Sequence, residues 1–353
     1  AGALVVGKTS LHEFAWGITG ENPHYGPCRN PWDDERIAGG SSSGCAAAVA
    51  LMVTPMAIGS DTAGSIRIPA AACGIIGMKP SYDLLPRSGL FPLAPTLDHV
   101  GLLARDPHDL ATLFRVTQGT RPALALGDPD EPAGNAPGDD LSAVRVGVLP
   151  STMCDHLDDD ISRAVCTARD VMVSMGAQAV ELKTTTLADP LRIFVPIQEA
   201  EAFFVHHSRG LFPERAGAYG DDVRRRLGSS RSVTLADYLS AASARERLGA
   251  DLQGVFETVD VLLTPVGASR TPKLADLSDD AVSSTFRRRM LPHTVPQSLA
   301  GVPCCAVRAG FDRNGMPVGV QFSAPRGADD RLLRLVATFH RATRAIQEQW
   351  PEH

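Results

Sequence analysis

Two short stretches rich in serine and glycine decide how this chain is interpreted: GGSSSG at residues 39–44 and GSDTAGSIRIPAA at residues 59–71. The first continues into SSGCAAAVALMV, a run of small residues that predicts a helix with a serine at its start. The pattern places two hydroxyls, those of Ser41 and Ser65, at turns that each enter a helix. Exposed backbone N–H groups at such positions favour developing negative charge.

Around these stretches the chain alternates between strand-like and helix-like segments. We expect strands at 56–59, 144–149, 178–182, 259–263 and 318–322, and helices at 161–175, 234–256 and 331–347. The second of these helices opens with Thr234 and Asp237 in the spacing of a capping box. This alternation predicts an α/β fold with helices on both faces of a sheet. Residues 3–7 are also expected to form a strand, and the Pro- and Gly-rich residues 119–141 a surface loop.

The composition is that of an ordinary globular protein. The 353 residues are 44% hydrophobic and 21% charged, and 34 basic against 40 acidic residues give a net charge of -6. This balance argues against nucleic-acid binding as the main function, because phosphate binding needs a concentrated positive field. No apolar stretch is long enough to span a bilayer. The seven cysteines show neither a CxxC pair nor zinc-ligand spacing, so we expect mostly reduced, buried thiols in a cytoplasmic protein without metal or cofactor.

Two other motifs match known patterns but do not fit the corresponding mechanisms. Residues 2–9 match G-x-x-x-x-G-K-T, yet the apolar Ala3–Val6 favour a buried strand over the flexible loop that cradles phosphate. Residues 40–44 match the nucleophile elbow G-x-S-x-G around Ser42. An elbow follows an apolar strand, whereas the polar DDERIAGG precedes this one.

The sequence on both sides of the two serine turns resembles the amidase signature family. The resemblance is carried by GKTSLHEFAWGITGENPHYGPCRNPWDDERIAGGSSSGCAAAVA from residue 7 and GSDTAGSIRIPAAACGIIGMKP from residue 59. It continues through VDVLLTP at 259–265, SLAGVPC at 298–304 and GMPVGVQF at 315–322. It implies one domain over residues 1–353, built on a large mixed sheet with helices on both faces. It also implies hydrolysis of a carboxamide to a carboxylate and ammonia or an amine through an acyl-enzyme.

The same resemblance implies roles for individual residues. Ser65 matches the nucleophile, and Ser41 matches the serine that relays its proton, after a cis peptide bond with Gly40. Backbone N–H groups of the second turn match the oxyanion hole, and three side chains match those that hold this turn. These residues are Thr62, Ala63, Gly64 and Ser65 for the oxyanion hole, and Ser42, Asp61 and Arg67 for its support. Ala63 stands where family members usually carry glycine.

The lysine base of the family has no match in this sequence. The four lysines are Lys8, Lys79, Lys183 and Lys273, and none stands in the strand–turn motif that carries the base in the family. A serine pair without its base loses most of its rate. We therefore expect the 353-residue chain alone to be inactive or nearly so. An N-terminal segment, absent from this sequence, is expected to supply the lysine.

Two alternatives stand beside a stand-alone amidase. One is the amidase component, the A subunit, of a glutamyl-tRNA(Gln) or aspartyl-tRNA(Asn) amidotransferase, although WGITGENPHYG at 16–26 departs from the pattern of that component. The other is a non-catalytic relative that serves as a scaffold, since a fold does not fix a function. For the amidase we expect a small-molecule amide as substrate, no direct contact with nucleic acid or membrane, and a homodimer as one state open to the protein.

Overall fold

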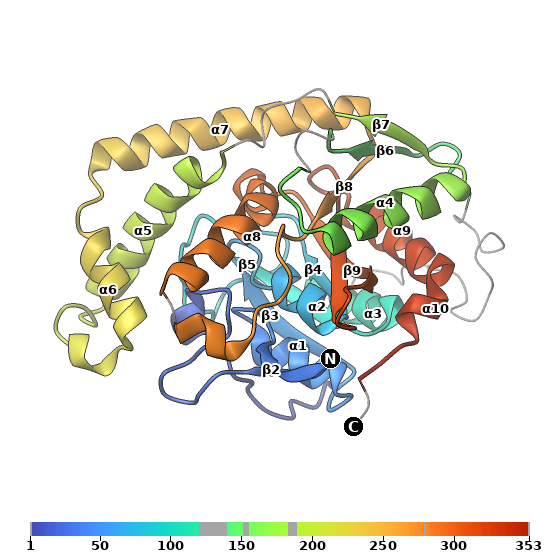
Figure 1. Cartoon of the computed structure of the whole chain (residues 1–353). Coiled ribbons are helices and arrows are strands. Elements are labelled where there is room, and N and C mark those ends of the chain that lie inside the picture. The colour runs from blue at the N-terminus through green and yellow to red at the C-terminus, as the bar shows by residue number, and fades with distance from the viewer. Residues whose placement is uncertain (1, 120–139, 151–154, 183–188, 279, 352–353) are drawn as a thin grey trace.

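An eight-stranded sheet runs through the molecule in the order β3-β5-β4-β9-β10-β8-β6-β7 (Figure 1). The structure is a computed structural model and describes residues 2–119, 140–150, 155–182, 189–278 and 280–351. The strands are β3 Met56–Asp61, β4 Ile76–Lys79, β5 His99–Ala104, β6 Arg145–Val148, β7 Gln178–Glu181, β8 Val261–Pro265, β9 Cys304–Phe311 and β10 Pro317–Ser323. Neighbouring strands of the sheet are antiparallel, except that β6 is parallel to both β7 and β8. The prediction of a large mixed sheet is confirmed.

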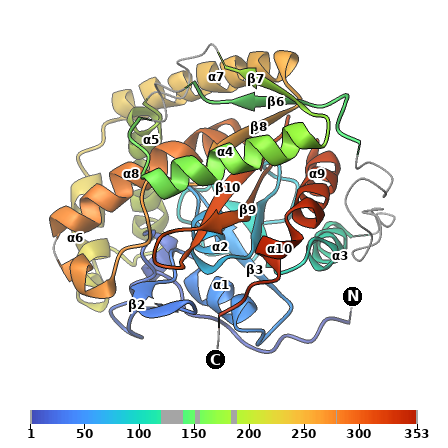
Figure 2. The same ribbon diagram turned by 45° about the vertical axis from the view of Figure 1, so that its right-hand side comes forward.

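Helices cover both faces of this sheet, as predicted (Figure 2). On one face α3 (Pro107–Gln118), α4 (Asp159–Ser174) and α9 (Asp329–Ala342) share one apolar core. On the other face a second core contains residues of α1 (Ser43–Ala50), α2 (Arg67–Cys73), α5 (Leu191–His207), α7 (Leu235–Thr258) and α8 (Asp280–Ala300). Neighbouring residues of β5 alternate between the two cores, Leu102 in the first and Leu103 in the second. The remaining elements are α6 (Asp221–Ser230), α10 (Arg344–Gln347), the strand pair β1 (Arg29–Asn30) and β2 (Asp33–Ile37), and short 3-10 turns.

Local sequence signals set several element boundaries. The capping box predicted at the start of α7 is present: the Thr234 hydroxyl accepts from the N–H of Asp237, and the Asp237 carboxylate accepts from the N–H of Thr234. The helix predicted over 331–347 is interrupted at Thr343 and continues as α10. Both the N–H and the hydroxyl of Thr343 bind the carbonyl of Phe339, which ends the regular helix there.

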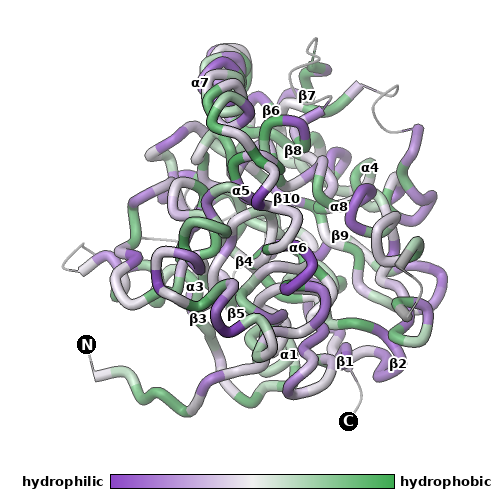
Figure 3. The backbone as a smooth tube through the Cα atoms, turned by 90° about the vertical axis from the view of Figure 1, so that its left-hand side faces the viewer, coloured by the Kyte–Doolittle hydropathy of each residue, from purple (hydrophilic) through white to green (hydrophobic). Residues whose placement is uncertain are grey.

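The prediction of a strand at residues 3–7 is wrong. These residues have no regular structure, and the apolar N-terminal segment lies away from the rest of the chain (green end in Figure 3). Leu4 and Val5 are 88% and 84% exposed. An apolar run becomes a strand where a neighbouring strand binds its N–H and C=O groups, and none of the described strands pairs with this one.

Two further expectations are only partly covered by the described residues. The surface loop at 119–141 lies almost entirely outside them. Among the described cysteines, four are buried, Cys28 is half-buried and Cys166 is exposed, so most of them are buried, as expected. No described helix combines the length and the apolar composition that crossing a membrane requires. The assignment of residues 1–353 to one domain stays a prediction, supported by a single large sheet whose strands span residues 56–323.

Gly101, in the middle of β5, generates the first testable prediction. A Cβ built on Gly101 would lie 2.3 Å from Cγ1 of Ile66, the residue that follows Ser65. We expect Gly101→Ala to lower the free energy of unfolding by about 1–3 kcal/mol through overpacking, measured by urea denaturation. Gly310→Ala in β9 is the matched control, because nothing lies within 4 Å of a Cβ there. Equal stability of the two variants would contradict this prediction.

Candidate active site

The two serine turns lie side by side. β3 ends at Asp61, and residues 62–66 turn from there into α2, while the first turn leads directly into α1. The backbone N–H of Ser42 donates to the carbonyl of Ser65 at 3.1 Å. The Ser42 hydroxyl donates to the carbonyl of Ser60 in β3 at 3.2 Å. Backbone and side chain of one residue therefore join the two stretches that the sequence analysis singled out.

Both candidate serines are buried, and the hydroxyl of Ser41 has no partner among the described residues. Ser41 is 1% exposed and follows a cis peptide bond with Gly40, as the resemblance implied, and Ser65 is 4% exposed. The Ser41 carbonyl accepts from the N–H of His12 at 3.1 Å. The Ser41 hydroxyl, by contrast, has no hydrogen-bond partner among the described residues. Because buried polar groups are almost always hydrogen-bonded, this hydroxyl marks a position where a further polar group belongs.

A fully buried ion pair holds the turn between β3 and α2. Nε of Arg67 donates to Oδ2 of Asp61 at 3.0 Å and Nη2 donates to Oδ1 at 2.9 Å, with both side chains 0% exposed. The same carboxylate accepts the N–H of Gly64 at 2.7 Å and that of Ile66 at 3.1 Å. Burial alone would raise the pKa of Asp61, but the charge and hydrogen bonds of Arg67 outweigh it and hold this pKa well below its usual range. Asp61 therefore stays ionised and fixes the backbone on both sides of Ser65.

Arg67 also connects this turn to elements far away in the sequence. Nη1 donates to the carbonyl of Thr294 at 2.9 Å and to Oε1 of Gln321 at 3.1 Å, and Nη2 donates to the Ser298 hydroxyl at 2.9 Å. The Thr294 hydroxyl donates in turn to the carbonyl of Ala63. These partners on α8 and β10 were missed by the sequence analysis. The signal was present for two of them, since Ser298 begins SLAGVPC and Gln321 lies in GMPVGVQF.

The backbone N–H groups of the second turn fall into two sets. The N–H of Gly64, expected in the oxyanion hole, donates to Asp61 instead. The N–H groups of Thr62, Ala63 and Ser65 have no acceptor within the described part of the chain. Gly64 has φ +124, and a Cβ there would lie 2.6 Å from Oγ1 of Thr294, so only glycine fits. Three N–H groups around the Ser65 turn are thus available to an oxyanion.

No described lysine hydrogen-bonds to either serine. Lys79 is buried, and its ammonium group donates to the carbonyls of Val302 at 2.6 Å and Pro80 at 3.3 Å. Burial lowers the pKa of Lys79 to about 7. Lys8 is exposed, Lys273 pairs with Glu35 at 2.6 Å, and Lys183 lies outside the described residues.

A cavity of about 1020 Å³ lies between the loop that precedes Ser41 and α8, and neither of the two serines lines it. Gly17 and Ile18 line it on one side, and a Cβ built on Gly40 would lie about 3.0 Å from atoms of both. Leu291 of α8 lines it as well, and its carbonyl accepts from the Thr294 hydroxyl at 3.5 Å. The cavity therefore touches the surroundings of both turns and has the size of a small-molecule site.

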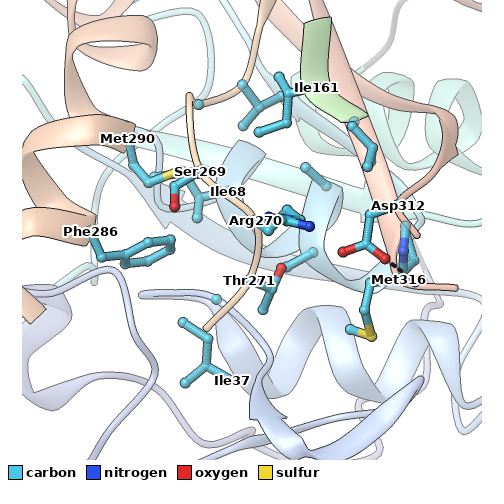
Figure 4. Close-up of a pocket in the computed structure, with 18 residues that line it drawn as sticks. Ile37, Ile68, Ile161, Ser269, Arg270, Thr271, Phe286, Met290, Asp312 and Met316 are labelled. Atoms are coloured by element: carbon cyan, nitrogen blue, oxygen red, sulfur yellow. Dashed lines mark hydrogen bonds between the residues drawn. The ribbon is translucent and has the colours of Figure 1, made fainter. Parts of the chain in front are cut away.

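A second cavity, beside Gly39, is too small for a substrate. Figure 4 shows it between Phe286 and Met290 on one side and Asp312 and Met316 on the other. It encloses about 40 Å³, room for no more than about three water molecules. Of these two cavities, only the larger has room for a small organic molecule.

Comparison with known proteins matches one family along nearly the whole chain. The family model described as Amidase matches residues 1–333. The A subunit of glutamyl-tRNA(Gln) amidotransferase from Gloeobacter violaceus is 36% identical, over 97% of this chain and 74% of its own length. Its counterpart from Prochlorococcus marinus (strain MIT 9313) is 34% identical, over 98% of this chain and 76% of its own length.

Solved structures show the same similarity in three dimensions. A crystal structure of an amidase has a TM-score of 0.83 at 32% identity, covering 96% of this chain and 75% of that one. The 6-aminohexanoate cyclic dimer hydrolase complexed with substrate has a TM-score of 0.82 at 27% identity, covering 98% and 76%. The observed sheet and its flanking helices are thus those of known amidase structures.

Removing one partner of the buried ion pair tests its role in holding the turn. Asp61→Asn leaves Arg67 as an uncompensated buried cation, so we expect the free energy of unfolding to fall by about 3–5 kcal/mol in urea denaturation. Asp170→Asn is the control, since Asp170 and its partner Arg169 are 65% and 42% exposed. The control should lose less than about 1 kcal/mol. A loss no larger in Asp61→Asn than in the control would refute this role.

Proposed function

The chain belongs to the amidase family, hydrolases that act on carbon–nitrogen amide bonds, and we propose that in this chain Ser65 is the nucleophile and Ser41 relays its proton. The observation that carries the proposal is the Ser41 hydroxyl, which is buried and has no partner among the described residues. It belongs to the residue next to Ser42, whose N–H binds the carbonyl of Ser65. A hydroxyl held there can take a proton from one side and pass it on at the other.

The proposed reaction proceeds through an acyl-enzyme. Oγ of Ser65 bonds to the amide carbon while its proton passes to Oγ of Ser41, whose own proton goes to a base. The free N–H groups of Thr62, Ala63 and Ser65 stabilise the oxyanion, and Asp61 with Arg67 holds their turn. The carbon–nitrogen bond then breaks, the leaving amine takes up the proton, and the acyl group stays on Ser65. Water, deprotonated through the same relay, attacks the ester and releases the carboxylate.

We propose further that the base is not one of the described lysines. Lys79 is held by backbone carbonyls, and Lys8 and Lys273 are exposed. The relay needs a neutral amine beside the Ser41 hydroxyl, the position that the described residues leave unfilled. We therefore expect these 353 residues by themselves to react slowly. The chain spans about three quarters of the length of the relatives it matches.

A second candidate function is that of an amidotransferase A subunit, because the curated relatives at 34–36% identity carry that name. The same serines would then release ammonia from glutamine only when partner proteins are present. Hydrolysis of a small amide without any partner favours the stand-alone amidase. A non-catalytic scaffold predicts no covalent adduct at Ser65 at all.

The cytoplasmic location and the homodimer stay predictions.

Covalent labelling tests the assignment of the two serines. Ser65→Ala should abolish the adduct that a fluorophosphonate forms, because the attacking hydroxyl is gone. Ser41→Ala should slow adduct formation further, by about 100-fold once a base is supplied, the usual contribution of a proton-transfer group. Both are followed by intact-protein mass spectrometry. Ser174→Ala, at an exposed serine of α4, is the control and should react like the wild type. An adduct of undiminished yield on Ser65→Ala would disprove the assignment.

Adding a base from solution tests the missing amine. Methylamine is small enough to stand in for a lysine amine, so at pH 9 we expect it to raise the labelling rate of the wild type by about 10-fold or more. Ser41→Ala should show no such gain, because the relay that connects the amine to Ser65 is absent. Tetramethylammonium chloride controls for ionic strength, since it has no basic lone pair. A wild-type rate that is already fast and does not respond to methylamine would mean that these residues contain their own base.

A further inference from the structure

We propose that Asp98 positions the turn of Ser65, because its carboxylate holds the hydroxyl of Thr62 and thereby keeps the backbone N–H of Thr62 directed at the oxyanion. This inference rests on the proposed function, since it concerns an N–H group that the proposed reaction uses. Asp98 acts through Thr62 and is therefore a positioning residue, not a catalytic one. The sequence analysis did not single it out.

The contact between these two residues holds the start of the turn that follows β3. The ion pair of Asp61 and Arg67 holds the later part of this turn and does not bind its first residue, Thr62. Oγ1 of Thr62 donates to Oδ1 of Asp98 at 2.7 Å, and both side chains are buried. No other side chain hydrogen-bonds to Thr62 among the described residues. The orientation of Thr62 therefore depends on Asp98.

The carboxylate of Asp98 is itself fixed, so it can serve as an anchor. Its Oδ2 accepts from the N–H of Leu93 at 2.9 Å, and both oxygens accept from the N–H of Ala94 at 3.1 Å. The N–H of Asp98 donates back to the carbonyl of Ala94 at 2.8 Å. Asp98 also directly precedes β5, which pairs with β3 along its whole length. One side chain thus ties Thr62 both to the sheet and to the loop before β5.

The charge of this carboxylate is balanced by hydrogen bonds and not by a cation. No arginine or lysine pairs with Asp98 in the part of the chain that the structure describes. Burial raises the pKa of Asp98 to about 6, and the negative charge of Glu201 on α5 acts in the same direction. A protonated carboxyl oxygen donates instead of accepting. The contact with Thr62 should therefore weaken as the pH falls through this value.

The charged groups of α5 and α7 closest in sequence contact are held one step away from Asp98. Glu201 of α5 accepts from the N–H of Thr96 at 2.9 Å, and Arg245 of α7 donates to the carbonyl of Thr96 at 2.8 Å. Both charges are thus held at a residue two positions before Asp98. Neither side chain hydrogen-bonds to the Asp98 carboxylate.

A second buried group titrates close to the same pH. Nζ of Lys79 on β4 lies 3.3 Å from Nε2 of His99, the residue after Asp98, and burial lowers the pKa of Lys79 to about 7. Burial also holds the pKa of His99 well below its usual range, so this ring stays neutral. A test has to separate the titration of Asp98 from that of Lys79.

The phosphorus resonance of the fluorophosphonate adduct tests the inference, because the adduct on Ser65 places a phosphoryl oxygen where the oxyanion forms. Slow labelling suffices, since the adduct is covalent and accumulates with time. In phosphorus NMR of the wild-type adduct, we expect the chemical shift to titrate with an apparent pKa of about 6. Asp98→Asn and Thr62→Val should each abolish this titration.

Two further variants control for a general loss of structure. Thr62→Ser keeps the hydroxyl and should keep the titration. Asp312→Asn alters another buried carboxylate that accepts backbone N–H groups, from Asn314 at 2.7 Å and Met316 at 3.0 Å, in the loop between β9 and β10. Its adduct should titrate like that of the wild type. Thr62→Val decides the question if Asp98→Asn does not fold, because it leaves the anchoring of Asp98 intact.

Labelling rates in the presence of methylamine at pH 9 give a second readout. Removal of an oxyanion donor costs about 100-fold or more, so displacement of one by Thr62→Val or Asp98→Asn should cost about 10-fold. The double variant should label no more slowly than the slower single variant, because both changes break the same contact. Additive losses, or single variants as fast as the wild type, would overturn the inference.

The outcomes distinguish this inference from the proposed function. Absence of any adduct at Ser65 would refute the proposed function, and the inference would fall with it. An adduct whose resonance does not titrate near pH 6 in the wild type would refute the role of Asp98 alone. A titration that persists in Asp98→Asn would belong to Lys79 and would also refute that role.

Discussion

The buried ion pair between Asp61 and Arg67 is the constraint on which the candidate site depends. Its carboxylate fixes the backbone on both sides of Ser65, and its guanidinium binds α8 and β10. Since both charges are fully buried, each is tolerated only because the other and a set of hydrogen bonds neutralise it. The geometry around Ser65 is therefore set by the assembled sheet and α8 together, not by the serine-rich turn alone.

Features encoded within a few neighbouring residues could be predicted from the sequence. The capping box at Thr234, the helix after Ser42 and the strand before Asp61 all appear where local pattern placed them. The mixed sheet and the approach of the two serine turns followed from a resemblance, whose quoted motifs also contain Ser298 and Gln321. These two residues turned out to contribute side chains to the Arg67 network.

Features that depend on distant partners could not be predicted. An apolar run such as residues 3–7 has strand composition, but whether it becomes a strand depends on a neighbour with free N–H and C=O groups. The engagement of the Gly64 N–H by Asp61 and the lack of a partner for the Ser41 hydroxyl among the described residues are likewise tertiary properties. Periodicity assigns a residue to a face of an element, and only the packing of that face shows which groups are left without a partner.

The strand order also has a consequence for how the protein is made. β4 lies between β5 and β9, and Met78 pairs with Cys305, about 230 residues later in the chain. A ribosome that adds about 5–20 residues per second needs about 10–45 s to synthesise the stretch between them. Throughout that interval the nascent chain carries one open, apolar edge of β4 and an Arg67 without its partners from α8 and β10. Protection of this edge by a chaperone, or delay of its folding until release, is therefore a requirement of the topology itself.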